Sequence, residues 1–467
     1  MKKRNGIIPM NCVDRALLAY ENTNQVMIIH MILSIEGEID ADRLNQALIS
    51  VLHLHPTMRT IMRSRHFRHF RQIQEDFEGK ILEVSDLADL KSVKDLSNVE
   101  INTGYERCLS EWINRPLDIE AEFPFRVLLL RKTAAEFSLI FTFHHSAVDE
   151  IRAIRFINEV ISRYNNKAPD ESLLPEDMRI HRKGDELVEL ARSERSKTEH
   201  FYREMLSHLL YFLFIAPYYR PSRIFHDKLE QSQEIRFCSG KINPTELEQM
   251  ESKSKSVSGT VNDILLAACF RTIEKWNRLH GEESKKISIM VPVDIGPEEL
   301  QHVFSNQLSY VSISTVRKDR TDTTKLLRRV RTKTAYIIRK SRGKTFFSVY
   351  LAYFFSRLPL AIHKPIAQFI SLPLYADTVA LSNVGFVRLG DDGDGEIGKG
   401  DFKITDFTFV GPVLNIMGIF LSAGTYNNNL SIDLSYKTSR FSKEKAGEFL
   451  DLYLEEIKNY QVDPEAD

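Results

Sequence analysis

Cysteine is scarce in this chain of 467 residues: there are only four, and no two of them form a Cys-x-x-Cys pair. Cys12, Cys108, Cys238 and Cys269 are widely spaced, so they indicate neither a disulfide framework nor a zinc site. We therefore expect free thiols, no bound metal and a reducing, cytoplasmic compartment.

The chain also lacks an excess of charge of one sign. Its 63 Lys and Arg residues nearly balance 64 Asp and Glu residues, which leaves a formal net charge of -1. Because a nucleic-acid-binding domain is normally basic as a whole, we expect no nucleic-acid partner, and any basic site must be local.

Long apolar runs are missing as well. The two most apolar stretches, residues 209–219 and 346–355, are each about half of the roughly 20 residues that cross a bilayer. The apolar stretch behind the basic N-terminus covers only residues 7–10, too few for a signal peptide. The sequence thus predicts neither a membrane span nor secretion.

The remaining composition is that of a globular protein, with 43% hydrophobic and 27% charged residues. At roughly 100 to 200 residues per domain, the length predicts two domains. We expect an N-terminal lobe over 1–165, a polar, proline-bearing linker over 166–200 and a C-terminal lobe over 201–467. Apolar periodicity and capping residues predict helices at 40–55, 151–164, 264–276 and 442–458, and a further helix that starts at 243. Strands are predicted at 127–130, 137–143, 287–293, 308–314, 379–387, 407–410, 419–426 and 430–436. Both halves are mixed helix and sheet, so the fold class is α/β.

One motif carries chemistry. The strand at 137–143 leads directly into His144-His145-Ser146-Ala147-Val148-Asp149, an HHxxxD sequence that precedes a helix. An imidazole can take a proton from a hydroxyl or amine and return it to a leaving group. From the spacing alone, the same residues could be metal ligands or an ordinary hydrogen-bonded histidine pair at a strand end.

Further segments match a known pattern in order along the chain. They are residues 9–14 (PMNCVD), 55–60 (HPTMRT), 115–118 (RPLD), 124–127 (PFRV), 260–268 (TVNDILLAA), 291–294 (VPVD), 305–306 (SN) and 382–385 (SNVG). With the HHxxxD motif, they resemble the superfamily of CoA-dependent acyltransferases, which includes nonribosomal peptide condensation domains, wax ester synthases, polyketide-associated acyltransferases and chloramphenicol acetyltransferase.

That resemblance implies two chloramphenicol-acetyltransferase-like lobes, each a mixed sheet flanked by helices, with a tunnel between them and the motif at its middle. It implies that His145 is the catalytic base, that His144 and Asp149 support it, and that Asn306, Ser382 or Asn383 line the tunnel or stabilise an oxyanion. The acyl donor would be acyl-CoA, or an acyl-phosphopantetheine carrier, and no cofactor would be bound permanently.

Three positions depart from the family pattern. Glu150 stands where a glycine usually follows the aspartate and leaves room for the donor arm. Gly296 stands where an arginine commonly follows the VPVD segment and pairs with that aspartate, and Ser305 replaces the glycine of a "GN" pair. A divergent substrate, a different partner for Asp149 or lost catalysis would each explain these changes.

Smaller signals suggest surface contacts. Nine Lys or Arg residues and no acid occur over 325–344, followed by the aromatic run at 346–355, so we expect either a solvated basic face or contact with anionic lipid or CoA phosphates. The acidic glycine-rich segment 390–397 reads as a turn rather than a calcium loop, and the basic, aromatic segment 63–71 as an exposed strand or loop.

The sequence therefore predicts a stand-alone acyltransferase that moves an acyl group from acyl-CoA to the hydroxyl or amine of a hydrophobic acceptor, because the chain ends soon after its final helix without assembly-line modules. One alternative is a condensation-type enzyme that takes its acyl group from a carrier protein. The other is a catalytically silent family member that binds a lipid or a partner. The basic and aromatic residues over 325–355 also predict a lipid-facing substrate or a peripheral membrane contact.

Overall fold

The fold was analysed in a computed structural model of the chain. The structure describes residues 6–21, 26–65, 68–77, 79–87, 98–165, 201–210, 214, 220–227, 229, 233–296, 303–337, 347–370, 377–390, 396–397 and 402–463.

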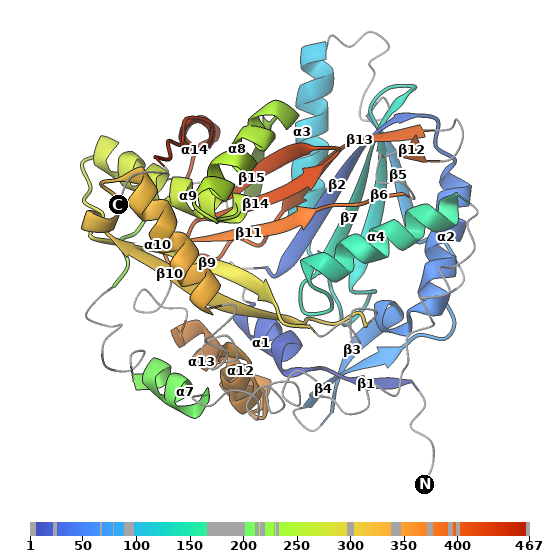
Figure 1. The fold of residues 1–467 in the computed structure, drawn as a ribbon. Coiled ribbons are helices and arrows are strands. Elements are labelled where there is room, and N and C mark those ends of the chain that lie inside the picture. The colour runs from blue at the N-terminus through green and yellow to red at the C-terminus, as the bar shows by residue number, and fades with distance from the viewer. Residues whose placement is uncertain are drawn as a thin grey trace.

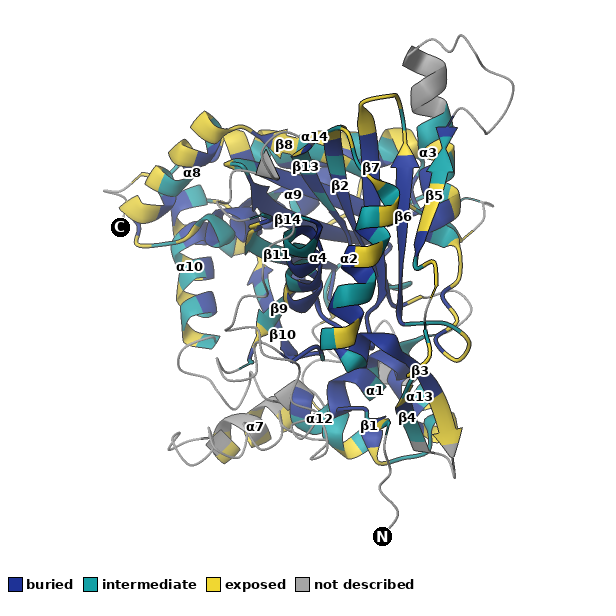
Figure 2. Ribbon diagram, turned by 90° about the vertical axis from the view of Figure 1, so that its right-hand side faces the viewer, coloured by how far each residue is buried: buried dark blue, intermediate teal, exposed yellow. Residues whose placement is uncertain are grey.

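The N-terminal lobe is a six-stranded sheet in the order β12-β13-β2-β7-β6-β5. Its strands are β2 (Ile28–Gly37), β5 (Leu82–Asp86), β6 (Phe125–Arg131), β7 (Glu136–His144), β12 (Glu396–Ile397) and β13 (Phe402–Val410). One face packs against α2 (Ala41–Leu54) and α4 (Glu150–Tyr164), and the other against α3 (Asn98–Asn114). Figure 1 shows α4 crossing the front of this sheet, α2 along its right-hand side and α3 behind it. Figure 2 shows that the central strands are buried along nearly their whole length, as their continuous apolar runs require.

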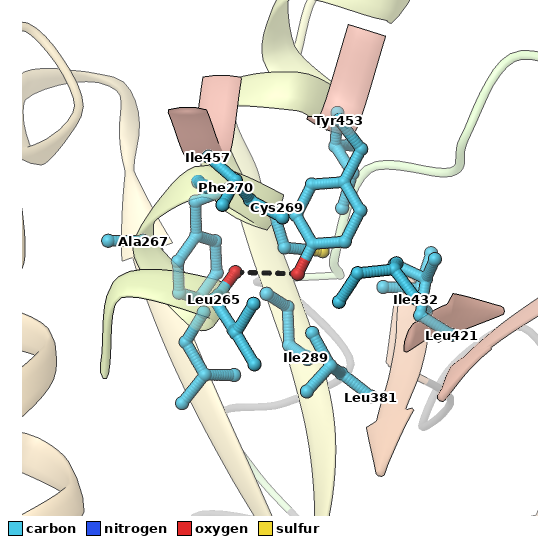
Figure 3. Close-up of a cluster of buried hydrophobic side chains, with 14 of the residues drawn as sticks. Leu265, Ala267, Cys269, Phe270, Ile289, Leu381, Leu421, Ile432, Tyr453 and Ile457 are labelled. Atoms are coloured by element: carbon cyan, nitrogen blue, oxygen red, sulfur yellow. Dashed lines mark hydrogen bonds between the residues drawn. The ribbon is translucent and has the colours of Figure 1, made fainter. Parts of the chain in front are cut away.

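The C-terminal lobe is a second six-stranded sheet, ordered β10-β9-β11-β14-β15-β8. Its strands are β8 (Ile235–Ile242), β9 (Lys286–Asp294), β10 (Leu308–Val316), β11 (Val379–Phe386), β14 (Ile419–Tyr426) and β15 (Asn429–Lys437). The helices α8 (Pro244–Ser256), α9 (Val261–Leu279), α10 (Thr323–Ala335) and α14 (Lys443–Lys458) accompany it, and a short 3-10 helix spans Arg317–Asp319. In its core, strand side chains meet α9 and α14, and the Tyr453 hydroxyl donates to the Leu265 carbonyl at 2.9 Å (Figure 3).

The C-terminal half of the sequence contributes two strands to the N-terminal sheet. β13 comes from the C-terminal half of the sequence, yet it pairs antiparallel with β2 of the N-terminal sheet, from Phe402 opposite Gly37 to Val410 opposite His30. The buried carboxylate of Asp433 on β15 accepts a hydrogen bond from the Phe409 backbone at 3.0 Å, and burial raises the pKa of this carboxyl to about 7. A division of the chain at 166–200 therefore does not by itself separate the two sheets, because β12 and β13 follow it in sequence and belong to the N-terminal sheet.

A smaller sheet lies below the junction of the lobes, in the order β1-β4-β3. It comprises β1 (Ile7–Pro9), β3 (Thr60–Arg65) and β4 (Arg68–Ile73), preceded by a 3-10 helix at Pro56–Arg59. Close by, α1 (Cys12–Tyr20) packs on α12 (Phe347–Ser356) and α13 (Leu360–Ile370). In both Figure 1 and Figure 2, α7 (Phe201–Leu210) lies beside α12.

The predicted elements are confirmed wherever local signals were strong. Asp40, Asn243, Thr260 and Ser442 cap α2, α8, α9 and α14 as expected. The β14–β15 hairpin turns at Asn427 and Asn428, both in the left-handed region that such tight turns require.

Three further expectations from the sequence concern the linker and acidic segment, the cysteines and membrane spans. The linker at 166–200 and most of the acidic segment 390–397 lie outside the described residues. The four cysteines, all within the described ranges, form no disulfide with one another. Among the residues that the structure describes, no helix is both long and apolar enough to cross a membrane.

Candidate functional site

The HHxxxD motif forms the loop between β7 and α4, at the junction of the lobes. β7 ends at His144, and the Asp149 side chain caps α4 by accepting a hydrogen bond from the Arg152 backbone at 3.0 Å. The His145 backbone nitrogen donates to the Met27 carbonyl at 2.7 Å, and that of Ala147 to the His144 carbonyl at 2.9 Å. The loop is thus held at both ends by regular structure.

His145 has one ring nitrogen committed to the protein. Its Nδ1 lies 3.1 Å from the Val148 carbonyl oxygen, and because a carbonyl only accepts, Nδ1 must carry a proton. In the neutral ring the lone pair is then on Nε2, which is the atom that a general base uses. Nε2 lies 3.6 Å from Glu150 Oε1.

Both ring nitrogens of His144 are used internally. Nδ1 accepts hydrogen bonds from the Ser146 backbone nitrogen at 3.2 Å and from its hydroxyl at 2.8 Å, while Nε2 faces Glu21 Oε1 at 3.2 Å. Burial alone would raise the pKa of the Glu21 carboxyl, but His144 beside it brings that pKa below its ordinary value. His144 therefore holds the loop and has no nitrogen left for a substrate.

Asp149 is the centre of a buried network that joins the lobes. Besides capping α4, its carboxylate accepts from the Gln307 backbone nitrogen at 2.8 Å and from Arg152 Nη1 at 3.2 Å. The same Arg152 nitrogen donates to Asp294 Oδ1 at 2.9 Å, and its other terminal nitrogen donates to Gln307 Oε1 at 3.0 Å. Burial would lower the pKa of Arg152, but Asp149 and Asp294 raise it, so the guanidinium stays charged.

Arg152 explains one departure from the family pattern. The arginine expected near position 296 is absent, and a Cβ on Gly296 would lie 2.5 Å from Arg152 Nη2 and closer still to Gln307 Oε1. The partner of Asp149 therefore comes from α4, three residues after it, and Gly296 leaves the space that this arginine occupies. Of the three explanations for the departure, the geometry supports a different Asp149 partner.

A second buried network fixes the other side of the loop. Arg71 Nη2 donates to Asp14 Oδ2 at 2.7 Å and to the Ser146 carbonyl. Arg71 is 4% exposed, so the expectation that segment 63–71 is an exposed strand or loop is wrong at this residue. Burial raises the pKa of Asp14, against the opposing effects of Arg71 and Asn306.

The structure places the three tunnel or oxyanion candidates differently. Asn306 Nδ2 donates to Asp14 Oδ1 at 2.8 Å and to the His145 carbonyl at 2.7 Å, so both of its amide protons are used within the protein. The Asn383 side chain contacts Asn262 at 3.4 Å and accepts from the Gly385 backbone at 3.0 Å, within the C-terminal lobe. Ser382 lies beside it on β11, opposite Ser422 of β14. Asn306 therefore connects the two lobes, and both of its amide protons are already used, so neither is available to stabilise an oxyanion.

A small, mainly apolar cavity of about 90 Å³ lies between α1, β10, α12 and α13. It is lined by Val13, Ala16, Leu17, Tyr20, Leu308, Tyr310, Val349, Leu351, Ala352, Phe355, His363 and Ala367. Burial, and then the carboxylates of Glu150 and Asp149, raise the pKa of Tyr310 well above its ordinary value. Tyr310 therefore connects this cavity with the carboxylates of the motif.

The metal-ligand interpretation of the motif finds no support in this geometry. His144 and Asp149 are directed to Ser146, Glu21 and Arg152 rather than toward a common point. In the part of the chain that the structure describes, no three His, Cys, Asp or Glu side chains converge as metal ligands.

Comparison with known proteins identifies the family. The family model described as "Condensation domain" matches residues 16–294, more than half of the chain. The chain belongs to the condensation-domain family. No curated protein matches it.

Several solved structures share the fold over nearly the whole chain. The epimerization domain from the third module of tyrocidine synthetase B is 15% identical, with a TM-score of 0.67 over 97% of this chain and 96% of that one. The SgcC5 protein from Streptomyces globisporus is 16% identical, with a TM-score of 0.64 over 97% and 98%. A mutant starter condensation domain of rhizomide synthetase, in complex with C8-CoA and Leu-SNAC, is 12% identical, with a TM-score of 0.67 over 97% and 94%.

Membership confirms the fold and the general chemistry. The mixed α/β architecture with two chloramphenicol-acetyltransferase-like lobes is that of condensation domains, within the CoA-dependent acyltransferase superfamily. The family supports acyl transfer in general. Inspection of the sequence missed Arg152, Arg71 and Glu21 as partners of the motif. Only Arg152 left a local signal, since a charge three residues from Asp149 on a helix lies on the same face.

Proposed function

We propose that this condensation-domain chain is an acyltransferase that moves an acyl group from acyl-CoA to the hydroxyl or amine of a hydrophobic acceptor, with His145 as general base. The observation that carries the proposal is the bond between His145 Nδ1 and the Val148 carbonyl, which leaves Nε2 as the basic nitrogen. His144 and Asp149 are both committed to neighbouring groups and serve as supporting residues.

In this mechanism Nε2 removes a proton from the acceptor as the acceptor attacks the thioester carbonyl. The carbon–sulfur bond then breaks, and the imidazolium returns the proton to the departing thiolate. The carbonyl of Val148 holds the ring in one orientation through both steps. Of the original oxyanion candidates, Ser382 and Asn383 stay proposals, because both amide protons of Asn306 are used within the protein, whereas Asn383 donates one of its two to Asn262.

The donor is proposed to be acyl-CoA, as a free co-substrate. A structural neighbour in complex with C8-CoA supports this choice. The alternative donor is an acyl-phosphopantetheine arm on a carrier protein, which is supported by a neighbour that is a four-domain nonribosomal peptide synthetase. The contrasting proposal is a catalytically silent member of the family that binds a lipid or partner.

Thiol release separates these proposals. The purified chain is incubated with acyl-CoAs of graded length and with a loaded carrier protein, each with a panel of hydrophobic alcohols and amines. We expect acceptor-dependent thiol release from acyl-CoA, because His145 and its supporting network are intact. Release from the loaded carrier alone would favour the condensation-type alternative. The absence of release from every donor would favour the silent binding protein.

Peripheral contact with an anionic membrane is also proposed, with a cytoplasmic location as the sequence predicts. It is supported by exposed apolar side chains on neighbouring helices: Leu206 of α7, Phe354 of α12 and Ile362 of α13 are 55%, 67% and 51% exposed. Basic side chains on α10 supply positive charge in the same half of the chain. We expect the protein to float with anionic liposomes at low salt. Recovery wholly in the soluble fraction would contradict this proposal.

A further inference from the structure

Glu150 is placed as a second group at the reacting nitrogen. It is the first residue of α4, it is 6% exposed, and its Oε1 lies 3.6 Å from His145 Nε2. Because His145 Nδ1 is bound to the Val148 carbonyl, the nitrogen that faces Glu150 is the one with the lone pair. A glycine, the residue usual in the family at this position, would bring no such group.

The surroundings of Glu150 leave its charge without a dedicated cation. Arg152, the nearest guanidinium along α4, is bound by Asp149 and Asp294. Within the described ranges, the ion pairs of Glu150 are confined to His145. The other titratable groups that face it are Asp149 on its own loop, Tyr310 on β10 and, beside Tyr310, Tyr20 on α1.

Burial makes this carboxylate receptive to a proton or a cation. It raises the pKa of Glu150 above its ordinary value; His145 and Arg152 oppose that effect, and Asp149 adds to it. An uncompensated buried carboxylate is costly, and a cation beside it removes much of that cost. A ligand with positive charge at the reacting atom and an apolar body would therefore match both Glu150 and the apolar cavity of about 90 Å³ that Tyr310 lines.

Hydroxyl and amine acceptors differ in the number of protons that they must lose during acyl transfer. A hydroxyl acceptor loses one proton during attack, and His145 can take it. A primary amine arrives at neutral pH as an ammonium ion, so it must lose one proton before attack and a second during it. His145 alone accepts one at a time.

We infer that Glu150 is a second proton acceptor of this site, and that it selects a small apolar amine that arrives as a cation. This inference rests on the proposed acyl transfer. The Glu150 carboxylate takes the first proton from the ammonium and becomes a carboxylic acid. The nitrogen then forms its bond to the thioester carbon and gives its second proton to His145 Nε2. As the carbon–sulfur bond breaks, that second proton passes to the thiolate, and Glu150 releases the first to solvent.

The test compares three acceptors of similar length with octanoyl-CoA at pH 7.5. Hexylamine is a cation, whereas O-pentylhydroxylamine and hexanol are neutral and need no first deprotonation. In the wild-type chain, hexylamine should be acylated. In Glu150→Gln, which keeps the shape and removes the basic oxygen, kcat/KM for hexylamine should fall by about 10²-fold. The same variant should change kcat/KM for the two neutral acceptors far less.

Two further variants make the comparison secure. Glu150→Gly, which carries the residue usual in the family, should show the same selective loss. Glu248→Gln, an exposed carboxylate on α8, should leave all three acceptors unchanged.

The outcomes distinguish failure of the role of Glu150 from failure of acyl transfer itself. An equal loss for all three acceptors, no loss for hexylamine, or acylation of hexanol but not hexylamine by the wild type would overturn the role of Glu150 and leave acyl transfer standing. No thiol release with any acceptor would overturn both.

Discussion

Arg152→Ala should destabilise the protein by about 3–5 kcal/mol, the usual consequence of removing one partner from a buried ion pair. Its side chain is 2% exposed and neutralises Asp149 and Asp294 together, so its loss leaves a buried carboxylate without a cation. The change is measured as a lower midpoint of thermal and urea unfolding. Activity should fall as well, because Asp149 caps α4 directly behind His145.

The matched control is Arg236→Ala. Arg236 forms an ion pair with Glu234 at 3.5 Å, but its side chain is 48% exposed, so this substitution should cost at most about 1 kcal/mol. Equal destabilisation by the two substitutions would mean that Arg152 is not the cation that Asp149 depends on.

The space at Gly296 provides a second check on the same network. Gly296→Ala should be destabilising in the wild-type chain, since its Cβ meets Arg152 Nη2 and Gln307 Oε1. In the Arg152→Ala background it should cost less, because one neighbour is gone and Gln307 is released from its bond to Arg152. Additive effects of the two substitutions would contradict direct contact.

His145→Ala should lower kcat for acyl transfer by about 10²- to 10⁴-fold, the range that general base catalysis contributes. The rate of acyl transfer is measured with saturating acyl-CoA and acceptor, on protein whose unfolding midpoint shows that it is folded. His53→Ala, which removes an exposed histidine of α2, is the control and should retain the wild-type rate. A His145→Ala variant that turns over at the wild-type rate would refute His145 as the base.

The sequence predicted much of the fold because many of its signals are local. Asp40 and Ser442 begin their helices, and the asparagines at 427 and 428 turn their hairpin, through contacts with residues only a few positions away. The HHxxxD motif was likewise found where a buried strand meets a helix start. The resemblance to a known family then supplied the two-lobed architecture, which local signals alone do not contain.

What the sequence could not predict depends on contacts between distant segments. The pairing of β13 with β2 brings Val410 opposite His30, and no local pattern marks that crossover. Asn306 resembled an oxyanion donor by its position in a motif, but its amide binds Asp14 and the His145 backbone, 292 and 161 residues away. Arg152 pairs with Asp149 from α4, whereas the family pattern led us to expect an arginine near position 296.

Transfer of an acyl group from a thioester to an acceptor at His145 is tested with the wild-type chain, octanoyl-CoA and hexylamine. The thiol released and the acylated acceptor, identified by mass spectrometry, are measured in the same reaction. We predict one molecule of N-hexyloctanamide for each thiol released. If thiol is released but no acceptor in the panel, hexylamine included, is acylated, the protein is a thioester hydrolase and acyl transfer at His145 is refuted.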